Sequence, residues 1–191
     1  GDEMGLGKTA QVIAAIAQIS KDEGISGPFL VVAPLSTLKQ WKNEFERWSN
    51  LTVTVFHGKK EGIKMIIETD FVTVDENGRN LDGFVNFDVL ITNPDTLMKQ
   101  YNIIQEIDWQ YLVIDEAQRI KNRHTNLFGH LSDLNWVHCT LLTGTPIQNN
   151  VEELYNLLHF IDRNKFNSAE EFIEKYGDMK TSEEVEELRG L

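Results

Sequence analysis

The stretch LVIDEAQ (residues 112–118) is an apolar run that ends abruptly in two carboxylates. The apolar pattern begins at Trp109, so the segment predicts a buried β-strand. Two acids at the end of such a strand are costly to bury unless they bind something. Either Asp115 holds Mg²⁺ and Glu116 polarises water at a nucleotide site, or both acids lie beside a helix N-terminus whose dipole stabilises them.

The start of the chain is typical of a phosphate-binding loop, with GLGKT at residues 5–9. Its glycines would let backbone N–H groups close around phosphate oxygens, Lys8 would reach the outer phosphates, and the Thr9 hydroxyl would bind Mg²⁺. The expected nucleotide-binding residues are Gly5, Leu6, Gly7, Lys8 and Thr9. The full pattern requires a glycine where Asp2 stands, so the strict pattern is not met, and a glycine-rich turn that caps a helix is the alternative interpretation.

Strand-like and helix-like patterns alternate along most of the chain. Strands are predicted at residues 29–34, 51–58, 87–94, 109–118 and 138–146. Helices are predicted at 8–20, 36–48, 60–68, 95–107 and 150–161, with a further helix in the acidic tail. Residues 71–81 predict a hairpin-like insertion. This order predicts an α/β fold with a mainly parallel sheet and helices on both faces, which binds ligands at the carboxyl ends of its strands.

Two further segments follow predicted strands, and each allows two interpretations. LLTGTPIQNN (141–150) is a compact polar loop that either senses the nucleotide or forms a strand-to-helix turn with an asparagine cap. In STLKQWKNEFERW (36–48), Ser36 and Thr37 either offer donors to a phosphate or simply cap a helix. Helical spacing places four apolar side chains of this segment on one face, which we interpret as core: Leu38, Trp41, Phe45 and Trp48.

Composition limits the function classes. The net charge of -12 argues by itself against nucleic acid, but the acids concentrate at residues 68–83 and 168–191, so a DNA-contacting surface can lie elsewhere. Cys139 is the only cysteine and stands in an apolar run, which indicates a packing role. The five histidines lack metal-ligand spacing. With no membrane-length apolar run and no signal-peptide pattern, we expect an intracellular protein without a membrane partner.

Four segments together resemble the first motor lobe of SWI/SNF-like ATPases in helicase superfamily 2. They are DEMGLGKT (2–9), VVAPLSTLKQW (31–41), VIDEAQRIKN (113–122) and LLTGTPIQNNVEELYNLLHFI (141–161). The tail and the insertion look most like the chromodomain-helicase-DNA-binding chromatin remodellers. The resemblance implies a RecA-like lobe over residues 1–191, ATP and Mg²⁺ as cofactors, and a nuclear protein that translocates on double-stranded DNA to remodel nucleosomes.

The resemblance also implies roles for individual residues. Asp115 and Glu116 would be catalytic, with Asp115 and Thr9 holding Mg²⁺. The residues that would couple the nucleotide site to DNA are Gln118, Thr143, Gly144, Thr145, Gln148 and Asn149. Those in motifs that face the DNA backbone are Ser36, Thr37, Lys121 and Asn122.

Two positions depart from the family pattern. The family usually has histidine at Gln118, but glutamine can donate and accept hydrogen bonds, so coupling can survive. Pro94 removes a backbone donor, which puts a DNA contact at residues 93–95 in doubt.

In this family a strand and a helix precede the phosphate loop, and a second RecA-like lobe follows the tail. We therefore expect a fragment truncated at its N-terminus, with a poorly anchored loop at residues 2–7 and a sheet edge that is either exposed or covered by a partner chain. Two alternatives remain: a P-loop kinase of small molecules, and a non-enzymatic interaction lobe. A kinase would need a lid and an acceptor pocket, and it would leave residues 142–150 without a clear role.

Overall fold

The computed structural model describes residues 7–22, 24–25, 27–72, 84–144 and 151–176. Within these ranges the centre of the molecule is a five-stranded sheet in the order β2-β3-β1-β4-β5, and every strand pair is parallel. The strands are β1 (Phe29–Val32), β2 (Val53–Phe56), β3 (Val89–Thr92), β4 (Trp109–Ile114) and β5 (Trp136–Leu141). The predicted α/β class and the parallel sheet are confirmed.

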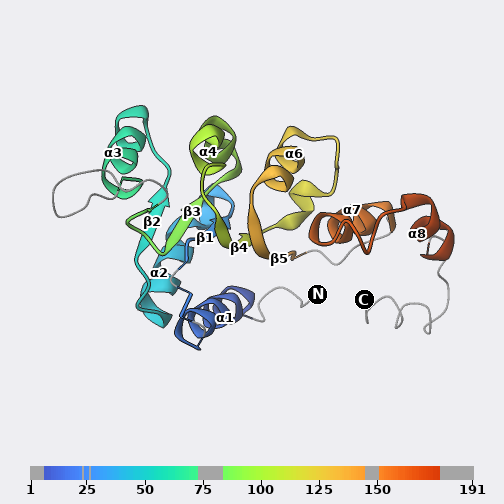
Figure 1. Cartoon of the computed structure of the whole chain (residues 1–191), viewed down its shortest axis with the longest axis horizontal. Coiled ribbons are helices and arrows are strands. Elements are labelled where there is room, and N and C mark those ends of the chain that lie inside the picture. Colours follow the sequence, from blue (N-terminus) through green and yellow to red (C-terminus); the bar gives the residue numbers. More distant parts are fainter. Residues whose placement is uncertain (1–6, 23, 26, 73–83, 145–150, 177–191) are drawn as a thin grey trace.

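Helices cover both faces of this sheet (Figure 1). One face packs against α1 (Lys8–Asp22) and α2 (Leu38–Trp48). The other carries α3 (Lys60–Asp70), α4 (Pro94–Lys99), α5 (Tyr101–Ile104) and α6 (Asn126–Asp133). Beyond β5 lie α7 (Val151–Ile161) and α8 (Ala169–Tyr176). Two short 3₁₀ helices, η1 (Leu35–Thr37) and η2 (Ala117–Ile120), follow β1 and β4.

The central strand β1 separates two hydrophobic cores. Phe29 and Val31 point into the cluster under α1 and α2, whereas Leu30 and Val32 point into the cluster under α3 to α6. All four side chains are almost fully buried. A strand that is buried on both faces requires a continuous apolar run, which is why its sequence carries no alternation.

The apolar face of helix α2 is shorter than the sequence predicts. Leu38, Trp41 and Phe45 are buried, but Trp48 is 54% exposed. Its indole N–H donates to Glu44, and Arg47 lies over its ring. The stripe therefore ends one turn before the helix does.

Two other helix predictions need correction. Residues 95–107 do not form one helix, because the chain breaks at Gln100 between α4 and α5. Helix α6 was not predicted at all, although Thr125 caps it by accepting from the N–H of Phe128. A short helix with few apolar positions gives only a weak periodic signal.

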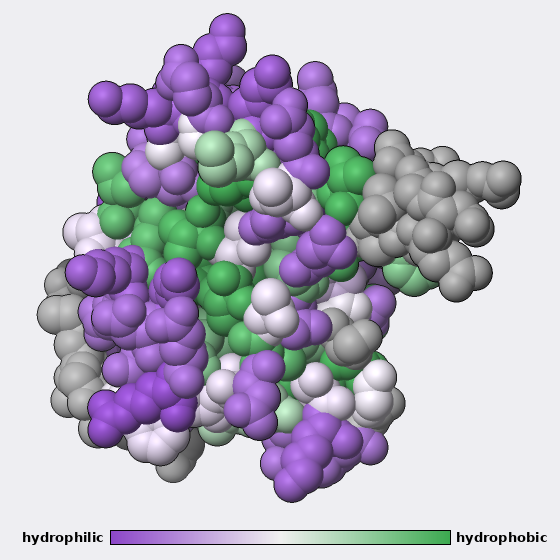
Figure 2. Space-filling model, turned by 90° about the vertical axis from the view of Figure 1, so that its left-hand side faces the viewer, coloured by the Kyte–Doolittle hydropathy of each residue, from purple (hydrophilic) through white to green (hydrophobic). Residues whose placement is uncertain are grey.

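Several predictions lie outside the described residues: the loop at residues 2–6, most of the insertion at 71–81, and the tail beyond residue 176. Among the described strands, β5 and β2 each have one neighbour, and Val137 of β5 is 60% exposed. On the side that carries β2, apolar surface is visible between hydrophilic rims (Figure 2). Across the described ranges, none of the helices is both long and apolar enough to span a membrane.

The two ends of the α2 stripe predict different mutational costs. Phe45→Ala should lower the free energy of unfolding by about 3–5 kcal/mol, because it leaves a cavity between α2 and the sheet. Trp48→Ala should cost about 1 kcal/mol or less, since it removes only surface contacts. Urea denaturation of the two variants measures the difference. Equal losses would contradict the placement of Trp48 on the surface.

Candidate functional site

The carboxyl ends of β4 and β5 and the start of α1 meet at one cavity of about 470 Å³. Three segments far apart in the sequence supply the residues predicted for nucleotide binding, catalysis or coupling: Gly7, Lys8, Thr9, Asp115, Glu116 and Gly144. The remaining lining residues are Ala10, Thr37, Gln40, Trp41 and Glu44. The structure thus brings the glycine-lysine loop and the paired acids together at the sheet edge where a parallel fold binds ligands.

Asp115 is the most firmly held of the acids. Its backbone N–H donates to the Val32 carbonyl over 2.8 Å, which ties it to the end of β1. One carboxylate oxygen, Oδ2, accepts from the indole N–H of Trp41 at 2.9 Å. The other, Oδ1, accepts from the backbone N–H of Glu116 at 3.0 Å. Both oxygens are therefore oriented by protein donors.

Partial burial raises the pKa of the Asp115 carboxyl above its ordinary value. The hydrogen bonds from Trp41 and from the backbone of Glu116 oppose this rise in pKa. The nearby Glu116 carboxylate adds to the rise in pKa, and the Lys8 ammonium counters it. An ionised carboxylate in this position favours a bound cation. The positive charge of the cation offsets both the cost of partial burial and the repulsion from the Glu116 carboxylate.

Glu116 has a left-handed backbone, with φ 54° and ψ 52°. Among the described residues it is the only non-glycine residue with positive φ. Its carboxylate accepts from the side-chain amide of Gln118, and the amide oxygen of Gln118 accepts from the Thr143 hydroxyl at 3.1 Å. A polar chain therefore connects the end of β4 to the loop after β5. Such backbone strain persists only where the surrounding structure holds it.

The loop side of the cavity is described from Gly7 onward. Gly7 has φ +74°, a conformation that suits glycine, and its carbonyl accepts the first α1 hydrogen bond from Gln11 at 3.0 Å. Helix α1 thus begins at the cavity, where its first N–H groups favour an anion. The predicted site residues Gly5, Leu6, Thr145, Gln148 and Asn149 lie outside the described residues.

The residues assigned to the DNA backbone do not form one group. Thr37 lines the cavity that Lys8 and Asp115 also line, whereas Ser36 is exposed. The predicted side-chain cap of α2 is not formed, because the Thr37 hydroxyl donates to the Pro34 carbonyl instead.

Lys121 and Asn122 line a second cavity of about 360 Å³. The Lys121 ammonium lies 2.7 Å from a carboxylate oxygen of Glu153, so its charge is already paired. Asn93 is 3% exposed and its side-chain oxygen accepts from Thr96, which agrees with the doubt about a DNA contact at residues 93–95.

Sequence reasoning missed the contribution of α2 to the cavity. Gln40, Trp41 and Glu44 all line it, one and two turns beyond Thr37. Helical spacing places these residues on the same face of α2 as Thr37, so the sequence could have indicated that they lie near the site. Trp41 was interpreted as core, and it is indeed 1% exposed, but its N–H points at Asp115.

The cavity fits a hard cation. Thr9 and Asp115 supply oxygen donors, which Mg²⁺ prefers, and Mg²⁺ is usually bound by one or two carboxylates together with water and phosphate. In the described ranges there is no cluster of three or more His, Cys, Asp or Glu side chains that could hold a metal ion. Burial raises the pKa of the Cys139 thiol to about 12, as expected of a packing residue.

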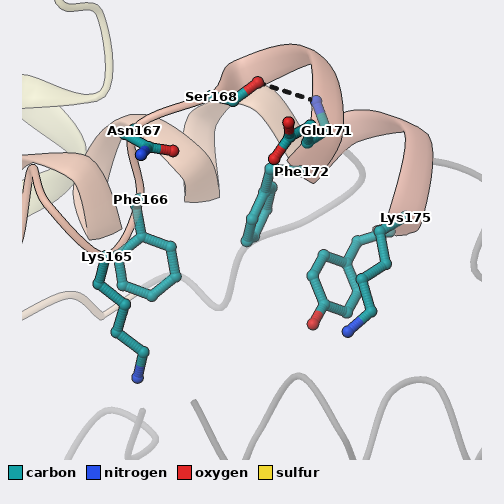
Figure 3. Close-up of a pocket in the computed structure, with 8 residues that line it drawn as sticks. Lys165, Phe166, Asn167, Ser168, Glu171, Phe172 and Lys175 are labelled. Atoms are coloured by element: carbon teal, nitrogen blue, oxygen red, sulfur yellow. Dashed lines mark hydrogen bonds between the residues drawn. The ribbon is translucent and has the colours of Figure 1, made fainter.

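A smaller pocket of about 230 Å³ lies along α8 (Figure 3). Lys165 lies over the ring of Phe166, and Lys175 lies over the ring of Tyr176. Ser168 accepts from the N–H of Glu171 and caps the helix. None of the predicted site residues that the structure describes lines this pocket.

Known proteins resemble the whole chain. The model of the SNF2-related domain family matches residues 1–191. Human Chromodomain-helicase-DNA-binding protein 8 is 43% identical over 190 residues, and rat Chromodomain-helicase-DNA-binding protein 6 is also 43% identical. The chain spans 7% of the length of each. The solved Sulfolobus solfataricus SWI2/SNF2 ATPase core in complex with dsDNA is 32% identical with a TM-score of 0.76, over 100% of this chain and 37% of that one.

The left-handed backbone at Glu116 predicts an inverted order of two substitutions. In a regular helix or strand, a protein with glycine is less stable than one with alanine by about 0.5–1 kcal/mol. In a left-handed backbone, alanine instead lowers the stability of the protein by about 1–2 kcal/mol. Glu116→Gly should therefore be more stable than Glu116→Ala by about 0.5–1 kcal/mol. Thermal unfolding of both variants checks this. A more stable alanine variant would mean that position 116 is not strained.

Proposed function

Because this chain belongs to the SNF2-related domain family, we propose that it is the first RecA-like lobe of a DNA-dependent ATPase. The whole protein would translocate on double-stranded DNA and remodel nucleosomes in the nucleus. The observation that carries the proposal is the single cavity in which Lys8, Thr9, Asp115 and Glu116 meet. The resemblance to the SWI2/SNF2 core, whose fold this lobe shares, supports the same assignment.

ATP would bind with its phosphates at the start of α1. Backbone N–H groups there and the Lys8 ammonium would neutralise the phosphate charge, which is the main task in phosphoryl transfer. Thr9 and Asp115 would hold Mg²⁺, which supplies charge neutralisation on the phosphates when bound. Trp41 and the backbone of Glu116 hold the Asp115 carboxylate in one orientation for this role.

Glu116 would act on the attacking water. Its left-handed backbone places it at the turn directly after β4, on the cavity wall. The hydrogen bond from Gln118 restrains its carboxylate, so water polarisation and the state of the following loop are linked. Thr143 extends the same chain to the segment after β5, which supports the coupling role proposed for Gln118, Thr143 and Gly144.

The complete ATPase would also need a second lobe and duplex DNA. The domain assignment of residues 1–191 as a first lobe implies a second RecA-like lobe that supplies positive charge to the transition state. The SWI2/SNF2 relative was solved as a complex with dsDNA, which supports duplex DNA as the partner here. Ser36 and Asn122 are exposed and available to a phosphate backbone, whereas Lys121 would have to exchange Glu153 for phosphate.

Two substitutions in the complete ATPase should separate binding from hydrolysis. Lys8→Ala should weaken ATP binding, because it removes the charge that meets the phosphates. Glu116→Gln should leave ATP binding intact and stop hydrolysis, since it removes only the group that acts on water. Binding of a fluorescent ATP analogue and steady-state phosphate release measure the two effects. Near-normal turnover by Glu116→Gln would overturn the catalytic assignment.

The lobe on its own should be nearly inactive. Positive charge supplied from a second protein element is worth roughly 10³–10⁵ in rate in related phosphoryl-transfer systems. We expect residues 1–191 alone to hydrolyse ATP slower than the two-lobe protein by about that factor, with or without duplex DNA. Single-turnover assays at matched concentrations test this. Full DNA-stimulated turnover by residues 1–191 would contradict the two-lobe proposal.

A further inference from the structure

Trp41 combines burial with a polar contact at the site. Its side chain is 1% exposed and lies in the core between α2 and the sheet, beside Phe45. Its only polar atom, Nε1, donates to Oδ2 of Asp115 at 2.9 Å. A buried tryptophan N–H needs an acceptor, but a backbone carbonyl satisfies that need, as Ile104 does for Trp109. Here the acceptor is instead a carboxylate at the mouth of a cavity.

The contact fixes the carboxylate and leaves it open to a ligand. The N–H of Trp41 and the backbone N–H of Glu116 each occupy one lone pair of Asp115, on different oxygens. A carboxylate has about four acceptor sites, so both oxygens keep capacity for a cation or its water. The large indole ring is packed in the core, so its donor cannot move away easily. This is the arrangement of an outer partner that orients a metal ligand.

Resting on the proposed function, we propose that Trp41 is a positioning residue for the Mg²⁺ ligand Asp115. Its indole N–H restrains the carboxylate of Asp115 in the cavity that Thr9 and Lys8 also line. Without this donor, one oxygen would face a buried region with no partner, and the carboxylate would lose its fixed orientation. Partners of this kind are typically worth 10–100-fold in metal affinity or activity.

The location of Trp41 gives the contact a second consequence. Helix α2 begins directly after η1, which contains Ser36 and Thr37, and Trp41 lies one turn into the helix. The helix is packed on the sheet through the buried side chains of Leu38, Trp41 and Phe45. The donor to Asp115 therefore lies one turn beyond the segment whose Ser36 and Thr37 the family resemblance assigns to the DNA backbone.

The test compares two buried tryptophans in the complete ATPase. Trp41→Phe keeps an aromatic ring but removes the donor to Asp115. Trp109→Phe is the matched control, because Trp109 is also 1% exposed, donates one hydrogen bond, and stands at the opposite end of β4 from Asp115. Two quantities are measured. Electron paramagnetic resonance gives the affinity for Mn²⁺ in the presence of ADP, and steady-state assays give the Mg²⁺ dependence of ATP hydrolysis. Urea denaturation reports the stability cost of each change.

We expect Trp41→Phe to weaken Mn²⁺ binding and to raise the half-saturating Mg²⁺ concentration by about 10-fold or more. Excess Mg²⁺ should restore much of its activity, and metal-free ADP binding should not change. Trp109→Phe should lose stability to a similar degree but keep wild-type metal affinity. Equal metal affinities in the two variants would overturn the positioning role. Wild-type protein that binds no metal with ADP would overturn the proposed function, and this inference with it.

Discussion

The burial of β4 is the constraint on which the site depends. Leu112, Val113 and Ile114 are almost fully buried between β1 and β5, so the strand cannot shift its register without exposing one core or the other. The position of Asp115 is consequently fixed at the end of the buried strand, where the cavity begins. The hydrogen bond from the backbone N–H of Asp115 to the Val32 carbonyl holds this position. A polar group placed at such a boundary is held by protein donors and still reaches a ligand.

The site is built by geometry common to parallel α/β proteins, with one element added from α2. The strands bring the acids and the loop after β5 to the same edge, and α1 brings Lys8 and Thr9 to it. Helix α2 then supplies the aromatic donor that orients Asp115. Because α2 also packs on the core, a single helix serves both the stability of the fold and the orientation of the Asp115 carboxylate.

The elements that could be predicted from sequence were those with a clear local pattern of apolar residues. Strand β4 and its acids, the parallel order of the strands and the helix after the glycine-lysine loop were all found, because each leaves a local pattern. Long-range contacts leave no such pattern: the bond from Trp41 to Asp115 joins residues 74 positions apart, and the pair of Lys121 with Glu153 crosses two elements. The exposure of Trp48 was missed because periodicity shows which face is apolar but not where the underlying sheet ends.

The measurement that tests the account most directly is ATP hydrolysis by the complete protein, with and without duplex DNA. The paired acids, the lysine and the threonine in one cavity predict hydrolysis of ATP to ADP and phosphate, and the proposed function predicts that duplex DNA increases the rate. Transfer of the phosphoryl group to a small-molecule acceptor, independent of DNA, would instead indicate a kinase. Binding to partners with no turnover of ATP under any condition would indicate an interaction lobe, and either of these results would contradict the account.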